Sequence, residues 1–417
     1  MGNSILFTSS TLPRNADDHQ APFVLEQAQA WKKERPDDRV VILAPHDQIA
    51  ERREHIGDVE IHRFQYFWPA RWQALAYPAI LPNLRSRPWL IFQIPFFLAA
   101  QYLVARRIVR DQAIDLVYAH WVMPQGLIAY GLWLSMGVPY VLQNHSSDMT
   151  VLLRADSLRK ALARKLILRA FGFFCVNEVQ KAQALDLFEP DQQSEIAEKM
   201  TVLPMGVGLD VSSVRFTAEV EAPWTHTAGT ISRLSRKKGI DLLIGAAEHL
   251  ADQGTRIPIA IAGDGEDRAK LEALPRSADI RFLGFLNGDN KVDFFNQTRS
   301  LIFPSTPAGS DVDGLPVSLL EALCCGKPVI AGLATNIEML AEWQLLQDHV
   351  TLLREPRNIV EFSDALERLI SRSEEDVRAD GARLRQIMER YLWPNLITEY
   401  LAAIDRLWTA KQGEGQI

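Results

Sequence analysis

The chain has 417 residues, of which 47% are hydrophobic and 23% are charged, and its formal net charge at pH 7 is -7. This length allows two domains of about 200 residues each, and the composition is that of an ordered globular protein. The negative charge argues against nucleic-acid binding, which requires a basic surface. The three cysteines suggest no disulfide framework and the N-terminal residues no secretory signal, so we expect a cytoplasmic protein.

The first half of the chain alternates short apolar runs with helical patterns, which is typical of a parallel sheet. We expect strands at NSILFTSS, VVILAPH, IDLVYAHW, PYVLQNHSS, GFFCVNE and MTVLPMG. His120 and His145 lie at the ends of two of these runs, where ordinary structural histidines are common. We therefore predict a first Rossmann-like domain over residues 1–205.

The second half repeats this scheme and predicts another doubly wound domain over residues 206–390. Its expected strands are AGTISRL, PIAIAGDG, DIRFLGFL, SLIFPST and KPVIAGL. The stretch between Gly206 and Thr225 has no clear period and contains several breakers, so we place the hinge there. Two such domains facing each other would put the carboxyl ends of both sheets on one cleft, where ligands bind.

The segment GSDVDGLPVSLLEALCCGKPVIAG predicts a strand end, a turn and a helix. Free amides at the helix start would form a phosphate site, and a glycine would let the backbone approach the ligand. Asp313 at the mouth and Glu321 further along the helix would offer acceptors on both sides of a diphosphate, which suits a nucleotide sugar. The plainer alternative is an acid near a helix dipole and a surface glutamate beyond it. The residues expected at the phosphate are Gly314, Leu315, Pro316 and Val317.

The segment TISRLSRKKG predicts a strand that ends in a loop carrying Arg233 and Lys238. Cations at the carboxyl edge of a sheet suit a diphosphate leaving group, although a basic loop is more often a solvated surface. Gly263, in IAGDGEDRAKLEAL, belongs to a further glycine turn at a strand end and is consistent with backbone packed near a nucleotide.

The order of SRLSRKKG, IAGDGEDRAKLE, FLGFL, FPST and DGLPVSLLEALCCGKPVIAG resembles the retaining glycosyltransferases of family 4, which have the two-domain GT-B fold. The resemblance covers nearly the whole chain. It implies that residues 391–417 form a helix that returns to the N-terminal domain. It also implies that Arg233 and Lys238 hold the diphosphate, that Glu321 accepts from the ribose, and that Asp313 contacts the donor sugar.

The N-terminal half supports the same resemblance. AHWVMPQG is similar to the family segment that places a histidine, here His120, beside the donor sugar, and NHSSDM, with His145, is similar to its HGSD. The resemblance implies transfer of a hexosyl group from a UDP- or GDP-sugar to an acceptor hydroxyl, with a lipid-linked saccharide as the expected acceptor. No metal or other cofactor is expected.

Other interpretations of these motifs remain open. The sequence DVD at 311–313 is a literal Asp-x-Asp metal motif and also mimics the start of a calcium loop, but the twelfth position of that loop is Ala322 instead of Glu. His19 with Asp17 and Asp18 could bind a metal, although a polar loop gives the same string. The alternative functions are a sugar-nucleotide epimerase of the same fold and an inactive scaffold subunit.

Two stretches of the N-terminal half bear on membrane binding. VLLRADSLRKALARKLILRAFGFF, residues 151–174, carries six basic residues and one acid, with Leu158, Leu162, Leu166 and Phe173 as its apolar side. We expect it to dock on an anionic membrane at the inner face. The uncharged run Trp89–Ala105 contains Gln93, Pro95 and Gln101, which favours a buried or interfacial helix over a membrane span.

Overall fold

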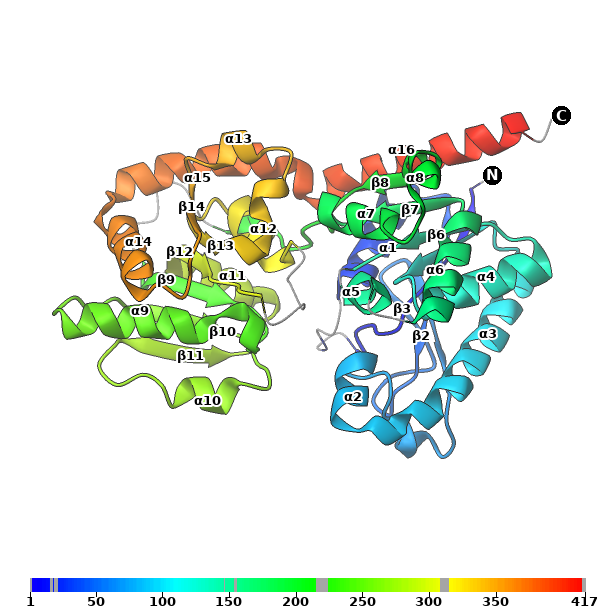
Figure 1. Ribbon diagram of the computed structural model, residues 1–417, viewed down its shortest axis with the longest axis horizontal. Helices are drawn as coiled ribbons and strands as arrows, with labels where there is room; N and C mark the ends of the chain where they lie inside the picture. Colours follow the sequence, from blue (N-terminus) through cyan, green and yellow to red (C-terminus); the bar gives the residue numbers. More distant parts are fainter. Residues whose placement is uncertain are drawn as a thin grey trace. The chain divides into compact units, whose positions relative to one another are not determined.

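Two β-sheets built from the apolar runs organise the structure, a computed structural model of the chain (Figure 1). It describes residues 2–15, 18, 22–145, 147–153, 156–214, 224–307 and 315–414. The chain divides into two compact units. Unit 1 is Met1–Gly206 with Trp393–Ile417, and unit 2 is Val207–Leu392.

Within the described residues, the sheet of unit 1 has eight strands in the order β3-β4-β2-β1-β5-β6-β7-β8. All neighbouring pairs are parallel except β3 and β4. The chain runs outward from β1 to one edge and then returns to β5, so the β1/β5 pair is the switch point of this sheet, outside which ligands bind. The strands are β1 (Ser4–Thr8), β2 (Arg39–Pro45), β3 (Arg53–Ile56), β4 (Val59–Phe64), β5 (Leu116–His120), β6 (Tyr140–Gln143), β7 (Gly172–Cys175) and β8 (Met200–Val202).

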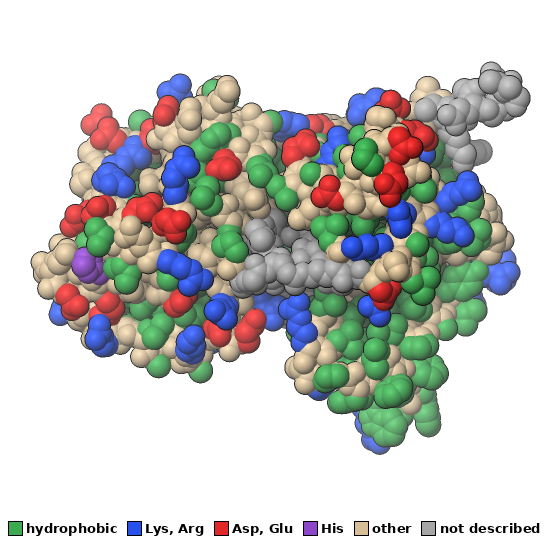
Figure 2. Space-filling model, viewed as in Figure 1, with side chains coloured by type: hydrophobic (Ala, Val, Ile, Leu, Met, Phe, Trp, Pro, Cys, Tyr) green, Lys and Arg blue, Asp and Glu red, His purple; other side chains and the backbone are tan. Residues whose placement is uncertain are grey.

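Helices cover this sheet in two groups. One group contains α3, α4 and α6, which pack side by side, and the other contains α1 and α16. The segment from η1 through α3 carries many exposed hydrophobic side chains, visible as a green area in Figure 2. The helices of unit 1 are α1 (Pro22–Glu34), α2 (Ile80–Ser86), α3 (Ile94–Asp111), α4 (Gln125–Met136), α5 (Ser147–Leu153), α6 (Ser157–Arg169), α7 (Glu178–Leu185), α8 (Pro190–Glu198), α16 (Trp393–Glu414) and the 3-10 turns η1 (Ala70–Trp72) and η2 (Pro88–Gln93).

The C-terminal helix α16 belongs to unit 1, as the returning helix of the predicted fold does. It packs against α1. Its buried Tyr400 hydroxyl accepts from Gln143 Nε2 over 2.9 Å and lies 3.0 Å from the carbonyl oxygens of Leu203 and Pro204. These hydrogen bonds fix the position of the helix, because a buried hydroxyl, amide or carbonyl group without a partner lowers the stability of the protein. The chain end therefore completes the core of unit 1.

The described sheet of unit 2 has six strands, all parallel, in the order β11-β10-β9-β12-β13-β14. Its switch point lies between β9 and β12. The helices α9 and α14 pack together, as do α12 and α15, and each pair contributes to a different buried cluster. The elements are β9 (His226–Ile231), α9 (Ile240–Asp252), β10 (Ile259–Ala262), α10 (Arg268–Glu272), β11 (Ile280–Gly284), α11 (Gly288–Gln297), β12 (Thr298–Phe303), α12 (Val317–Cys324), β13 (Val329–Gly332), α13 (Trp343–Leu346), β14 (Val350–Leu353), α14 (Ile359–Ser371), α15 (Glu374–Met388) and the 3-10 turn η4 (Arg236–Lys238).

Candidate active site

The loops after β9 and β10 are bonded to each other at the carboxyl edge of the unit 2 sheet. The amides of Ser232 and Leu234 donate to the carbonyl oxygens of Ala262 and Asp264 over 3.1 and 2.9 Å. Gly263 has a φ of 128°, and a Cβ atom there would stand 1.8 Å from the Ser232 carbonyl oxygen. Glycine is therefore required at this position by the neighbouring loop, whether or not a nucleotide also lies there.

The loop after β9, residues 232–239, is here called the basic loop, and it is held in the same way against the end of β12. It passes through η4 to Gly239, which has a φ of 65° and whose missing Cβ would lie 2.2 Å from the carbonyl oxygen of Pro304. The amide of Thr306 donates to the carbonyl oxygen of Lys237 over 2.9 Å. The loop after β9 and the loop after β12 thus meet at the switch point, which is where a doubly wound sheet binds its ligand.

Both predicted diphosphate cations lie on this loop. Arg233 follows β9, and its side chain is half exposed and pairs with Glu266, with Nη2 3.0 Å from Oε2. Lys238 is the last residue of η4 and is partly buried. Glu266 was not predicted from the sequence, although its position directly after the GDG turn is a usable signal. The geometry gives a cationic loop with its backbone fixed and its side chains accessible.

The start of α12 differs in detail from the expectation, drawn from the sequence, that Pro316 lies in the first turn of the helix. Pro316 is the residue before the helix, and its carbonyl oxygen accepts from the amides of Leu319 and Leu320. The amides of Val317 and Ser318 therefore precede the first bond within the helix, as in an anion-binding helix start. Leu315 is partly buried. Asp313 and Gly314 lie outside the described residues, as does the DVD motif.

Glu321 is buried, so the alternative interpretation of this residue as a surface glutamate is wrong. Its side chain is only 7% exposed, and its Oε1 accepts a hydrogen bond from Lys291 Nζ at 2.6 Å. Lys291 lies on α11, thirty positions away in the chain, and nothing in the sequence pattern pointed to it. One lysine occupies only part of the capacity of a carboxylate, which can accept several hydrogen bonds, so Glu321 retains acceptor capacity for a ligand hydroxyl.

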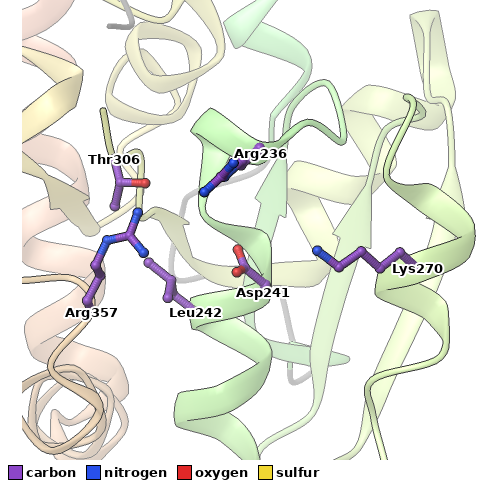
Figure 3. Close-up of a pocket in the computed structure, with 6 residues that line it drawn as sticks. All are labelled: Arg236, Asp241, Leu242, Lys270, Thr306 and Arg357. Carbon is purple, nitrogen blue, oxygen red and sulfur yellow. The ribbon is translucent and has the colours of Figure 1, made fainter. Parts of the chain in front are cut away.

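A pocket of about 240 Å³ lies beside the basic loop in unit 2 (Figure 3). Its side chains come from η4, α9 and α10 and from the loops after β12 and β14. In Figure 3, Lys270 points toward Asp241, while Arg357 lies next to Thr306 and Leu242. Arg233 and Lys238 do not line it. The lining residues are Arg236, Asp241, Leu242, Lys270, Thr306 and Arg357.

The two histidines of unit 1 form a contact pair at its switch point. His120 is the last residue of β5 and is fully buried, and its Nδ1 lies 3.0 Å from Nε2 of His145, which follows β6. The His120 ring stacks on Phe7 of β1. Asp148 accepts hydrogen bonds from the amides of His145 and Val122 and thereby fixes the turn.

Burial keeps this pair neutral. It lowers the pKa of His120 well below its usual value of 6.5, to which the neighbouring His145 contributes, and it lowers the pKa of His145 to about 3. At neutral pH each ring then has one N–H donor and one acceptor nitrogen. Rings with so low a pKa are weak bases.

We expect acid to destabilise unit 1 through these rings. Below pH 6.5 the histidines of the unfolded chain bind protons while the folded rings stay neutral, so stability is present above that pH and falls as the pH drops toward 3. The loss by pH 5 should be about 2 kcal/mol for His145, whose pKa is lowered to about 3, and His120 should add to it in the same direction. Urea unfolding at pH 7.5 and pH 5 measures it. His145→Asn should reduce the pH dependence, whereas the exposed His55→Asn should not, and an equal slope in all three proteins would contradict the assignment.

Two family models match most of the chain. Residues 224–383 match glycosyl transferases group 1, and residues 20–206 match the glycosyl transferase 4-like domain. The chain is 30% identical over 199 residues to a putative colanic acid biosynthesis glycosyltransferase of Salmonella typhimurium, covering 44% of this chain and 48% of that protein. It is 25% identical over 327 residues to a 2-deoxystreptamine glucosyltransferase of Streptomyces kanamyceticus, covering 70% and 78%. With several relatives the match spans less than half of the relative's own length.

The fold is also found in solved structures. Anabaena HepE in complex with UDP-glucose superposes with a TM-score of 0.64 and 16% sequence identity, and the alignment covers 96% of this chain and 99% of HepE. The predicted arrangement of two Rossmann-like domains with a returning C-terminal helix is confirmed.

Proposed function

This chain is a GT-B glycosyltransferase of the family 4-like type, and we propose that it moves a hexosyl group from a UDP- or GDP-sugar to an acceptor hydroxyl with retention at the anomeric carbon. The observation that carries the proposal is the switch point of unit 2. There the loop bearing Arg233 and Lys238 is bonded to the loop after β12, which leads to α12 and the buried Glu321.

Each residue of this site has a part in donor binding. Arg233 and Lys238 would neutralise the diphosphate, and the amides at the start of α12 would bind its phosphate oxygens. Glu321 would accept from a ribose hydroxyl. In unit 1, the neutral His120 would hydrogen-bond a hydroxyl of the donor sugar. Asp313, which lies outside the described residues, keeps its proposed role as a contact of that sugar.

The chemical step would need no basic side chain. The bond from the anomeric carbon to the diphosphate oxygen breaks, the acceptor oxygen attacks the same face of the sugar, and its proton passes to the departing phosphate oxygen. Catalysis then consists of positioning the reactants and stabilising the charge on the diphosphate. The low pKa of His120 is consistent with a positioning group. In this proposal Arg233 and Lys238 stabilise the negative charge of the leaving diphosphate, as a metal ion does in other transferases.

We further propose a lipid-linked saccharide as the acceptor, at the cytoplasmic face of the inner membrane. The likeness to a colanic acid biosynthesis glycosyltransferase supports a role in polysaccharide assembly. The likeness to HepE, solved with UDP-glucose, supports a nucleotide-sugar donor.

A donor screen tests the proposal. The purified protein is incubated with UDP- and GDP-sugars and membrane lipid extract, and released nucleoside diphosphate and new glycolipid are measured. The expected result is release of one nucleoside diphosphate. The new glycosidic bond, analysed by NMR, should have the anomeric configuration of the donor. Neither the diphosphate nor the product should form with an Arg233→Ala/Lys238→Ala variant. A new sugar nucleotide without diphosphate release would indicate an epimerase, and neither product would indicate a scaffold.

A further inference from the structure

Unit 1 exposes a large apolar surface, here called the aromatic surface. Soluble proteins rarely expose contiguous large apolar side chains, and such patches usually mark interaction sites. Tryptophan in particular buries much of its area in a protein core. Each member of this surface is more than half exposed, with Trp68 at 83% and Phe92 at 75%. The members are Trp68, Trp72, Trp89, Ile91, Phe92, Phe96 and Leu103.

The aromatic surface belongs to a segment whose other side is already packed. The exposed members lie just before and on η1, on η2 and on one stripe of α3. The opposite stripe of α3 enters the core of unit 1 through Phe97, Ala105 and Ile108. Phe67 packs edge-on against Phe96, with ring centroids 5.5 Å apart. The exposed stripe is therefore not needed for the core, so its apolar character requires another explanation.

The charged residues of the segment that carries this surface are mainly positive. Between Gln65 and Gln112 the only charged residues are six arginines and Asp111, a local excess of five positive charges in a chain whose net charge is -7. On α3 the exposed stripe is apolar at Phe96 and becomes basic at Arg106, about 15 Å further along the axis at the usual helical rise. The arginines are Arg71, Arg85, Arg87, Arg106, Arg107 and Arg110.

We propose that the aromatic surface docks unit 1 on an anionic membrane. Tryptophan and phenylalanine suit the boundary between headgroups and acyl chains, and arginine suits the lipid phosphates. The 24-residue stretch Pro88–Asp111 is long and apolar enough to cross a membrane by composition. Its buried stripe packs on the sheet, so it lies on the membrane instead of spanning it. This inference concerns membrane binding and is independent of the proposed reaction, so its test requires only lipid vesicles.

The basic helix α6, which the sequence favoured for docking, has a different character. Its Leu166 and the following Phe173 are buried in the core, and Leu162 packs against it. Of the predicted apolar side, Leu158 is exposed. The helix therefore offers mainly charge, with Lys165 above the ring of Tyr130. Docking through α6 alone stays a prediction, and the two surfaces are separable by mutation.

Flotation of the full-length protein with vesicles tests the proposal. Vesicles of phosphatidylcholine with about 30% phosphatidylglycerol should bind it, and binding should weaken at least tenfold in Trp68→Ser/Phe92→Ser/Phe96→Ser. A matched control replaces exposed apolar residues of unit 2, in Leu345→Ser/Ile359→Ser/Val360→Ser, and should bind like the wild type. In the wild type, lipids brominated in their acyl chains should quench tryptophan fluorescence. Thermal unfolding verifies that each variant is folded.

Several outcomes would overturn the proposal. Unchanged binding of the aromatic variant would do so, as would loss of binding only in an α6 variant with Arg159, Lys160, Arg164 and Lys165 changed to Glu. The wild type could also fail to bind vesicles and instead self-associate. If the aromatic variant then no longer self-associates, the surface binds a second copy of the chain. Sugar-nucleotide turnover with a soluble acceptor should be the same in wild type and aromatic variant, so failure of docking and failure of the proposed reaction are distinguishable.

Discussion

Replacing either predicted diphosphate cation, in Arg233→Ala or Lys238→Ala, is expected to lower kcat/KM for sugar transfer about 100-fold. Each cation would face a leaving group whose negative charge grows in the transition state, and losing one such contact typically has an effect of this size. The decrease should lie in kcat as well as in KM, because the charge is greatest after the bond begins to break. Steady-state kinetics with the donor found in the screen measures it.

Two control variants isolate the effect of these cations. Glu266→Gln removes the ion-pair partner of Arg233 and leaves the cation in place, so its activity should stay within a few-fold of the wild type. Arg236→Ala removes a cation from the same loop that lines the neighbouring pocket, and it should have a smaller effect than Arg233→Ala. Normal rates in both Arg233→Ala and Lys238→Ala would mean that the diphosphate is held elsewhere.

The second large effect concerns the ion pair between the buried Glu321 and the partly buried Lys291. Glu321→Ala should abolish measurable donor binding and also lower the free energy of unfolding by about 2 kcal/mol, because the partly buried Lys291 is left without its carboxylate partner. Lys291→Met should destabilise similarly by leaving Glu321 unpaired. Urea unfolding and calorimetric titration with the nucleoside diphosphate measure the two effects.

The double variant Glu321→Leu/Lys291→Met separates the structural role of Glu321 from its binding role. Replacing both charges with apolar groups should restore most of the stability, since a buried ion pair often contributes little more than a packed apolar pair. Donor binding should stay lost, because the ribose acceptor is gone. Recovery of both properties would reduce Glu321 to a structural residue and remove the ribose assignment.

The main elements of the fold could be predicted because parallel strands buried on both faces are continuous apolar runs. LVYAH, IAIA and VIAG show this in β5, β10 and β13. The strands β3, β4 and β14 were not predicted; in β4, VEIHRF, charged side chains interrupt the apolar run. The sequence REHI of β3 is charged and only partly buried, and it pairs antiparallel at the edge, so it lacks the apolar signal. VTLL of β14 is too short to stand out from the helices around it.

The residues of the candidate site could likewise be predicted only in part from the sequence. That Arg233 and His120 lie at ligand-binding edges could be predicted, because each follows an apolar strand and parallel topology places all strand ends on one edge. The partners of site residues could not be predicted. Lys291 reaches Glu321 across thirty positions, and the His120–His145 contact depends on how β5 and β6 pair.

The sequence by itself determined most of the strands of this protein, the positions of its glycine turns and the family that its motifs indicate, because those signals are local. Only the tertiary structure decided which faces are buried. The basic helix α6 and the apolar helix α3 both carry apolar side chains whose burial the sequence left open. Leu166 of α6 enters the core, whereas Phe96 and Leu103 of α3 remain exposed because α3 packs on α4 and the sheet through its opposite stripe.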